Sequence, residues 1–157
     1  MRASREVLFG MILGDLERPL GVRADTALSP GQLRSLVILQ GYDLNPVRER
    51  LLRTELLTPA LVDLMIFEFR RYLGLRLVQG RSVPMLSRAV DEVWHTALLF
   101  TRLYADLCQN VFGSFMHHDP ATEAWPDVDE RWNDFNASYH SLYGPLGVLW
   151  DNARRAQ

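Results

Sequence analysis

Three of the chain's four histidines and its only cysteine lie within one stretch, residues 87–120. In this stretch His95 directly follows Trp94, and Asp91 precedes His95 by one helical turn if the segment is helical. A carboxylate beside an imidazole fixes its tautomer and raises its basicity. This spacing favours either general-base catalysis by His95 assisted by Asp91, or coordination of a divalent metal completed by ligands from other helices.

A straight helix over residues 88–112 would carry one polar stripe. Because an α-helix turns by about 100° per residue, Arg102 and Asp106 would align with Asp91 and His95. The remaining circumference is largely apolar, and the side opposite His95 is expected in the core: Val93, Ala97, Phe100, Tyr104, Cys108 and Val111. A single polar stripe on such a helix is expected to face a cleft or a partner.

Three other side chains are candidates for the same region. Trp94 is expected in the core or at the wall of the groove, and Glu68, in a preceding long helix, is a candidate ligand from outside. His118 follows a glycine that should end the helix, and it is a second candidate metal ligand. The alternatives are structural: a hydrogen bond between Asp91 and His95 and no more, and the capping of a neighbouring helix by His118 or Asp119.

A straight helix also keeps His95 apart from the His117–His118 pair. The helix would rise about 27 Å from His95 to Gly113, whereas the extended residues that follow can return at most about 14 Å. A kink near Gln109 would be needed, and no proline lies there. We therefore expect His95 and His118 to belong to two separate sites within one chain.

Nucleophilic hydrolysis has little support in this sequence. Cys108 points away from His95 on a straight helix and is expected to be a small buried apolar residue. No glycine-x-serine-x-glycine elbow and no glycine-rich phosphate loop occurs.

Helix-capping residues divide the chain into helical segments. Capping side chains precede a proline or an apolar run at five positions: Ser29, Asn45, Thr58, Ser87 and Asp127. The last of these, with Glu130, resembles a capping box. No segment alternates with a period of two residues. We predict an all-α fold with one domain over residues 1–157, an orthogonal or irregular bundle of five to seven helices around a central helix near 88–112.

The composition narrows the class of partner. The net charge of −2 argues against a dedicated nucleic-acid binder, and the arginines are expected to form a solvated helix face: Arg48, Arg50, Arg53, Arg70, Arg71 and Arg76. No apolar run approaches the roughly 20 residues of a membrane span. A single cysteine is typical of a reducing compartment, so we expect a cytoplasmic protein.

A spaced set of residues in the motif stretch points to a known family: Val90-Asp91-Glu92-Val93-Trp94-His95, then Tyr104, Cys108, Phe112-Gly113 and His118-x-Pro120. The set resembles the helical domain of the glycine-rich-domain-containing proteins of plants and fungi and their small bacterial relatives. Many plant members carry Trp-His-x-His, whereas Ala97 stands at the second histidine position here. The resemblance implies a helical fold and the place of a site, but no reaction.

Together these patterns predict a small helical binding or regulatory module. Its groove would follow the Asp91/His95 helix and take a protein or a small molecule, with no nucleic-acid or membrane partner. The alternative is an enzyme or metal-dependent accessory protein that uses His95 as general base or metal ligand. A divalent metal is the cofactor that these side chains could hold.

Overall fold

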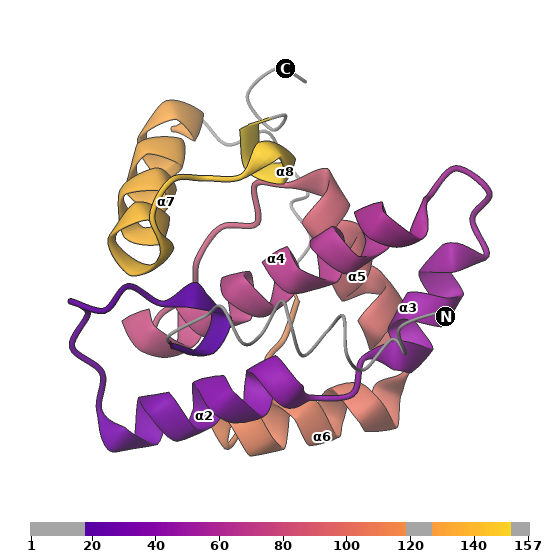
Figure 1. The fold of residues 1–157 in the computed structure, drawn as a ribbon, viewed down its shortest axis with the longest axis horizontal. Coiled ribbons are helices and arrows are strands. Elements are labelled where there is room, and N and C mark those ends of the chain that lie inside the picture. Colours follow the sequence, from indigo (N-terminus) through magenta and orange to yellow (C-terminus); the bar gives the residue numbers. More distant parts are fainter. Residues whose placement is uncertain (1–17, 119–126, 152–157) are drawn as a thin grey trace, which may run out of the picture.

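The computed structural model describes residues 18–118 and 127–151, and every regular element in these ranges is helical. The 3-10 helix η1 (Pro19–Gly21) comes first. Seven α-helices follow in these ranges: α2 (Pro30–Gly41), α3 (Asn45–Leu52), α4 (Pro59–Gln79), α5 (Arg88–Leu99), α6 (Thr101–Phe112), α7 (Val128–Tyr143) and α8 (Val148–Asp151) (Figure 1). The prediction of an all-α bundle is confirmed. Within the described ranges, no helix combines the length and the apolar character that crossing a membrane requires.

Side-chain caps begin three of the helices as predicted. Ser29 forms a full capping box with Gln32: its hydroxyl accepts from the Gln32 backbone at 3.1 Å, and the Gln32 side chain accepts from the Ser29 backbone at 2.9 Å. Thr58 and Ser87 each accept a hydrogen bond from the backbone N–H three residues on. These caps satisfy N–H groups that would otherwise lack a partner at the start of a helix.

The other two predicted caps are wrong. Asp127 makes no side-chain cap because its carboxylate pairs with Arg131, at 2.9 Å. Asn45 is already the first residue of α3, and its N–H is capped by Asp43, whose carboxylate accepts at 2.9 Å. Arg131 thus engages the carboxylate that was expected to cap α7, and Asp43 takes the capping role that was expected of Asn45.

The most buried helix is α4, and it takes the central place that we predicted for residues 88–112. Helices α2, α3, α5 and α7 all pack against it (Figure 1). Its buried residues are distributed around much of its circumference: Val62, Met65, Ile66, Glu68, Phe69, Arg70, Tyr72, Leu73, Gly74 and Leu75. A helix that buries residues on several sides belongs at the centre of a bundle.

The segment predicted as one straight helix is two helices, because the chain breaks at Phe100. This residue has φ −95° and ψ 67°, ends α5 and begins α6. The break lets α5 and α6 pack against each other. Trp94 on α5 and Tyr104 on α6 are therefore hydrogen-bonded at 2.8 Å, although a straight helix would separate them by about 15 Å along its axis.

The prediction of a solvated arginine face is wrong for α4. Arg70 is buried and donates to the carbonyl oxygens of Leu39 and Tyr42 near the end of α2. Burial lowers the pKa of its guanidinium to about 10. Arg71 is partly buried and donates to the Leu20 carbonyl oxygen at 2.9 Å. These two arginines hold η1 and α2 onto the central helix.

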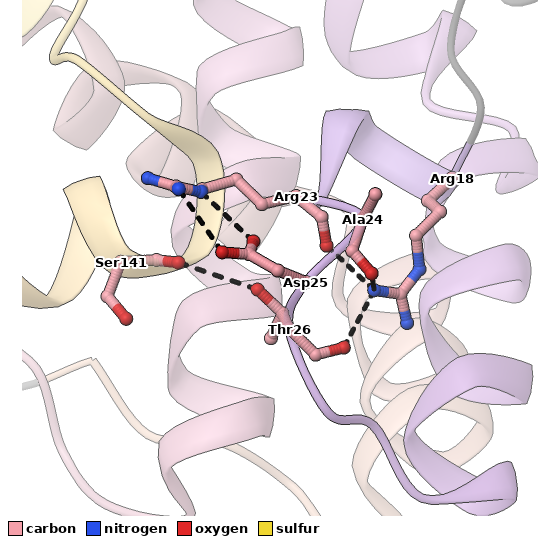
Figure 2. Close-up of polar contacts among 6 residues, drawn as sticks. All are labelled: Arg18, Arg23, Ala24, Asp25, Thr26 and Ser141. Atoms are coloured by element: carbon pink, nitrogen blue, oxygen red, sulfur yellow. Dashed lines mark hydrogen bonds and ion pairs between the residues drawn. The ribbon is translucent and has the colours of Figure 1, made fainter.

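The loop before α2 is anchored to α7 by polar contacts (Figure 2). The Arg18 guanidinium donates to the carbonyl oxygens of Arg23 and Thr26, each at 2.7 Å. The Thr26 hydroxyl donates to the Ser141 carbonyl oxygen at 3.5 Å, and the Arg23 N–H donates to the Leu142 carbonyl oxygen at 2.9 Å. The loop thereby joins the first and the last thirds of the described chain.

Candidate functional site

Asp91, His95 and His118 converge on one small region. His95 Nε2 lies 3.5 Å from Asp91 Oδ2, and His118 Nε2 lies 3.1 Å from Asp91 Oδ1. One ligand atom from each of the three side chains lies within 4.8 Å of the others. The predicted separation of His95 and His118 is therefore wrong. The physical reason is the break at Phe100, which turns the chain so that the segment after α6 lies beside α5.

A chain of contacts through the core positions His118. Its ring stacks on the indole of Trp94, with ring centroids 4.1 Å apart and planes 16° from parallel. Trp94 Nε1 donates to Tyr104 Oη, and the Tyr104 hydroxyl donates to the Met116 carbonyl oxygen at 2.6 Å. Burial raises the pKa of Tyr104, which keeps its hydroxyl protonated and able to donate well above neutral pH. The segment that carries His118 is thus tied to both helices.

The three side chains line a cleft with a volume of about 660 Å³. Residues from α4, α5, α7 and the loop between α4 and α5 form its walls. Tyr72 fixes that loop, because its hydroxyl donates to the Val83 carbonyl oxygen at 2.6 Å. The His118 side chain is 8% exposed whereas that of His95 is 48% exposed, so the cluster reaches from the protein interior to solvent. The volume is typical of small-molecule sites.

The Asp91 carboxylate is the negatively charged group of this cluster, and it needs a partner. Its Oδ1 is buried, and His118 Nε2 lies 3.1 Å from it, within hydrogen-bond distance. A buried carboxylate oxygen is unfavourable unless a hydrogen-bond donor or a positive charge compensates it. Two arrangements satisfy this oxygen: an imidazole that carries a proton on Nε2, or a metal cation between the carboxylate and the two imidazoles. Two imidazole nitrogens with one carboxylate form a donor set suited to zinc, iron or manganese.

The predicted polar stripe does not exist as one surface. Asp106 lies on α6, where its Oδ2 accepts from the Tyr42 hydroxyl at 2.6 Å. Burial and this bond to Asp106 raise the pKa of Tyr42 to about 12. Arg102, also on α6, is exposed, and neither Arg102 nor Asp106 lines the cleft. The break at Phe100 separates them from Asp91 and His95, which invalidates the helical rotation used to align them.

Glu68 lies in the interior away from the cleft. Its Oε2 accepts from the Tyr139 hydroxyl at 2.6 Å and from Trp150 Nε1 at 2.8 Å. Its Oε1 lies 3.6 Å from Arg71, and Glu68 does not line the cleft. These contacts give Glu68 a structural role in joining α4 to α7 and α8.

The remaining motif residues divide between core and surface. Cys108 is buried, as predicted. His117 is exposed and lines the cleft, but its ring contacts Phe115 at a centroid distance of 4.9 Å and it is not part of the three-residue cluster. Asp119, the alternative helix cap, and Pro120 of the motif lie outside the described residues.

A family model matches residues 35–136, which include Asp91, His95 and His118. The chain belongs to the UCP032817-like family. This match corrects the resemblance to the glycine-rich-domain-containing proteins, which rested on spaced motif residues alone. The UCP032817-like family is uncharacterised, so membership adds no reaction to the geometry. No curated protein matches the chain, and no solved structure does.

Proposed function

We propose that this UCP032817-like protein binds a divalent transition metal through Asp91, His95 and His118. The observation that carries the proposal is the approach of two imidazole Nε2 atoms to the two oxygens of one carboxylate, at 3.5 and 3.1 Å. Ligands about 2.1 Å from a metal lie roughly 3 to 4 Å from one another. Small side-chain movements would therefore bring all three ligand atoms onto one ion.

The surroundings favour a metal over a purely structural ion pair. Two imidazole nitrogens converge on the two oxygens of one partly buried carboxylate, and stacking on Trp94 fixes the ring of His118. A metal site with three protein ligands keeps positions open for a further ligand. The cleft beside the cluster has the volume to admit a small molecule to those positions. We therefore propose a small molecule as the partner.

General-base catalysis by His95 without a metal is the second candidate function. The pairing of His95 with Asp91 at the cleft favours it, because a half-exposed imidazole beside a carboxylate is accessible to a substrate. This candidate does not require His118 as a ligand.

Zinc titration of the full-length protein against a competing chelator tests the proposal. We expect one metal ion per chain, with elemental analysis of the purified protein giving the same stoichiometry. Loss of a residue that only orients a metal ligand typically weakens metal binding by roughly 10- to 100-fold. His95→Ala and His118→Ala each remove a ligand, so each should weaken zinc binding by more than this. His117→Ala is the matched control, because it removes the neighbouring imidazole from the same cleft and should leave the affinity unchanged.

Two results would contradict metal binding by this cluster. One is a wild-type protein that binds no zinc above the level of the double variant His95→Ala/His118→Ala. The other is a His118→Ala variant that binds zinc as tightly as the wild type, which would leave His95 and Asp91 as an isolated pair.

A further inference from the structure

Arg76 differs from the other partly buried arginines in the described chain. It lies in the last turns of α4 and lines the cleft. Its guanidinium carbon lies 5.5 Å from the centre of the Trp94 ring and 6.0 Å from that of Tyr72. One nitrogen donates to the Tyr72 hydroxyl at 3.4 Å. No carboxylate and no carbonyl oxygen of the described residues pairs with this guanidinium.

The other partly or fully buried arginines of the described chain all have carboxylate or carbonyl partners. Arg48 pairs with Asp63 through two nitrogens, and Arg131 pairs with Asp127 at 2.9 Å. The remaining partly or fully buried arginines, Arg18, Arg70 and Arg71, donate to carbonyl oxygens. A guanidinium presents five N–H donors in a planar fork that matches the oxygens of carboxylates and phosphates. Arg76 therefore keeps donors available at a wall of the cleft.

Arg76 and the proposed metal site share one aromatic platform. Trp94 carries the stacked ring of His118 at 4.1 Å between centroids and the guanidinium of Arg76 at 5.5 Å. A bound divalent ion would add two positive charges, of which Asp91 neutralises one. The metal and Arg76 would then both present positive charge to the same cleft. An anion with several oxygen atoms could bind the metal with one oxygen and Arg76 with another.

We propose that the cleft binds a small oxyanion, a carboxylate or phosphate group of a metabolite, between the metal and Arg76. This inference rests on the proposed metal site and names the class of its ligand. The metal supplies the open coordination position, and the Arg76 fork orients the remaining oxygens. Uncharged small molecules are not expected to bind in this way, because they offer no anionic oxygen to the guanidinium or to the open position on the metal.

Spectroscopy of the cobalt-loaded protein tests the inference. Full-length protein saturated with Co²⁺ is titrated with methylphosphonate and, separately, with acetate, and the visible absorption bands of the metal report changes in its ligands. We expect at least one of the two anions to shift these bands in a saturable manner. Arg76→Met keeps much of the unbranched stem but removes the guanidinium that lies over Trp94, and it should weaken binding of that anion about tenfold or more.

Two further variants serve as controls for Arg76→Met. Arg34→Met removes an exposed arginine from α2, outside the cleft, and should bind the anion as the wild type does. Arg76→Lys keeps the charge without the fork and should lie between the wild type and Arg76→Met. Circular dichroism verifies that each variant is folded before loading.

The outcomes separate this inference from the proposed function. A wild-type protein that does not bind Co²⁺ overturns the metal site itself. A protein that binds Co²⁺ but whose spectrum responds to neither anion overturns the oxyanion inference and leaves the metal site standing. Equal affinity for the anion in Arg76→Met and wild type also overturns the inference, because Arg76 would then serve only as packing on Trp94.

Discussion

Substituting Tyr104 by phenylalanine should destabilise the protein and disturb the metal site together. The Tyr104 hydroxyl accepts from Trp94 Nε1 at 2.8 Å and donates to the Met116 carbonyl oxygen at 2.6 Å. Phenylalanine keeps the ring, so no large cavity forms. It leaves the buried Trp94 N–H without an acceptor, at about 1 to 3 kcal/mol, and removes the donor to Met116, at about 1 kcal/mol. Together the free energy of unfolding should fall by roughly 2 to 4 kcal/mol.

The same substitution should weaken metal binding, because Met116 lies two residues before His118. Without the Tyr104 hydroxyl, the segment that presents His118 loses the hydrogen bond from Tyr104 to Met116 that ties it to α6. We expect the zinc affinity to fall about 10- to 100-fold, as for other residues that orient a ligand. Urea unfolding followed by circular dichroism measures the stability, and zinc titration of the folded variant measures the affinity.

Tyr143→Phe is the control for a lost buried hydroxyl. Tyr143 is buried and its hydroxyl donates to the Arg71 carbonyl oxygen at 2.9 Å, outside the cleft. It should cost about 1 kcal/mol and leave the zinc affinity unchanged. The reasoning about Tyr104 is refuted if Tyr104→Phe loses no more stability than this control. If the two variants bind zinc equally well, the Tyr104 hydroxyl does not help to position His118 for metal binding.

Three further predictions concern the interior and the pH dependence of stability. Gly74→Ala should lower the free energy of unfolding by about 1 to 3 kcal/mol in urea melts, because a Cβ atom there would overlap the Tyr143 hydroxyl. Glu68→Ala should cost about 3 to 5 kcal/mol in the same assay, since it leaves buried donors such as Trp150 Nε1 without an acceptor. The pKa of Tyr42 is raised from 10.0 to about 12, so its contribution to stability is complete below pH 10 and is lost as the pH rises to about 12. Tyr42→Phe should flatten this part of a stability–pH curve measured by urea unfolding.

Local sequence signals predicted the fold class and the starts of several helices. Ser29, Thr58 and Ser87 cap the helices that follow them, because capping needs only a side chain and a backbone N–H three residues away. Asp91 and His95 were also paired from sequence, since one turn of α5 holds both. These features depend on short-range geometry, which a sequence pattern can carry.

The break at Phe100 could not be predicted in the same way. Neither proline nor glycine lies at the break, and the segment has the periodicity of one continuous helix. Packing of α5 against α6 decides the outcome, and packing depends on the whole bundle. A single error in helix continuity therefore placed His118 in a separate site. Arg76 was missed for a related reason: charge alone suggested a solvated face, and only the tertiary structure places it against Trp94.

The return of the chain at Phe100 also bears on how the protein unfolds. A metal held by Asp91 and His118 would be a reversible cross-link that closes a loop containing all of α6. Cross-links stabilise a fold mainly by restricting the unfolded chain, and they do so more strongly when the loop is longer. Chelation should therefore loosen α5 and α6 as one unit, visible as faster hydrogen exchange along both helices. The stability of this region would then depend on the supply of metal.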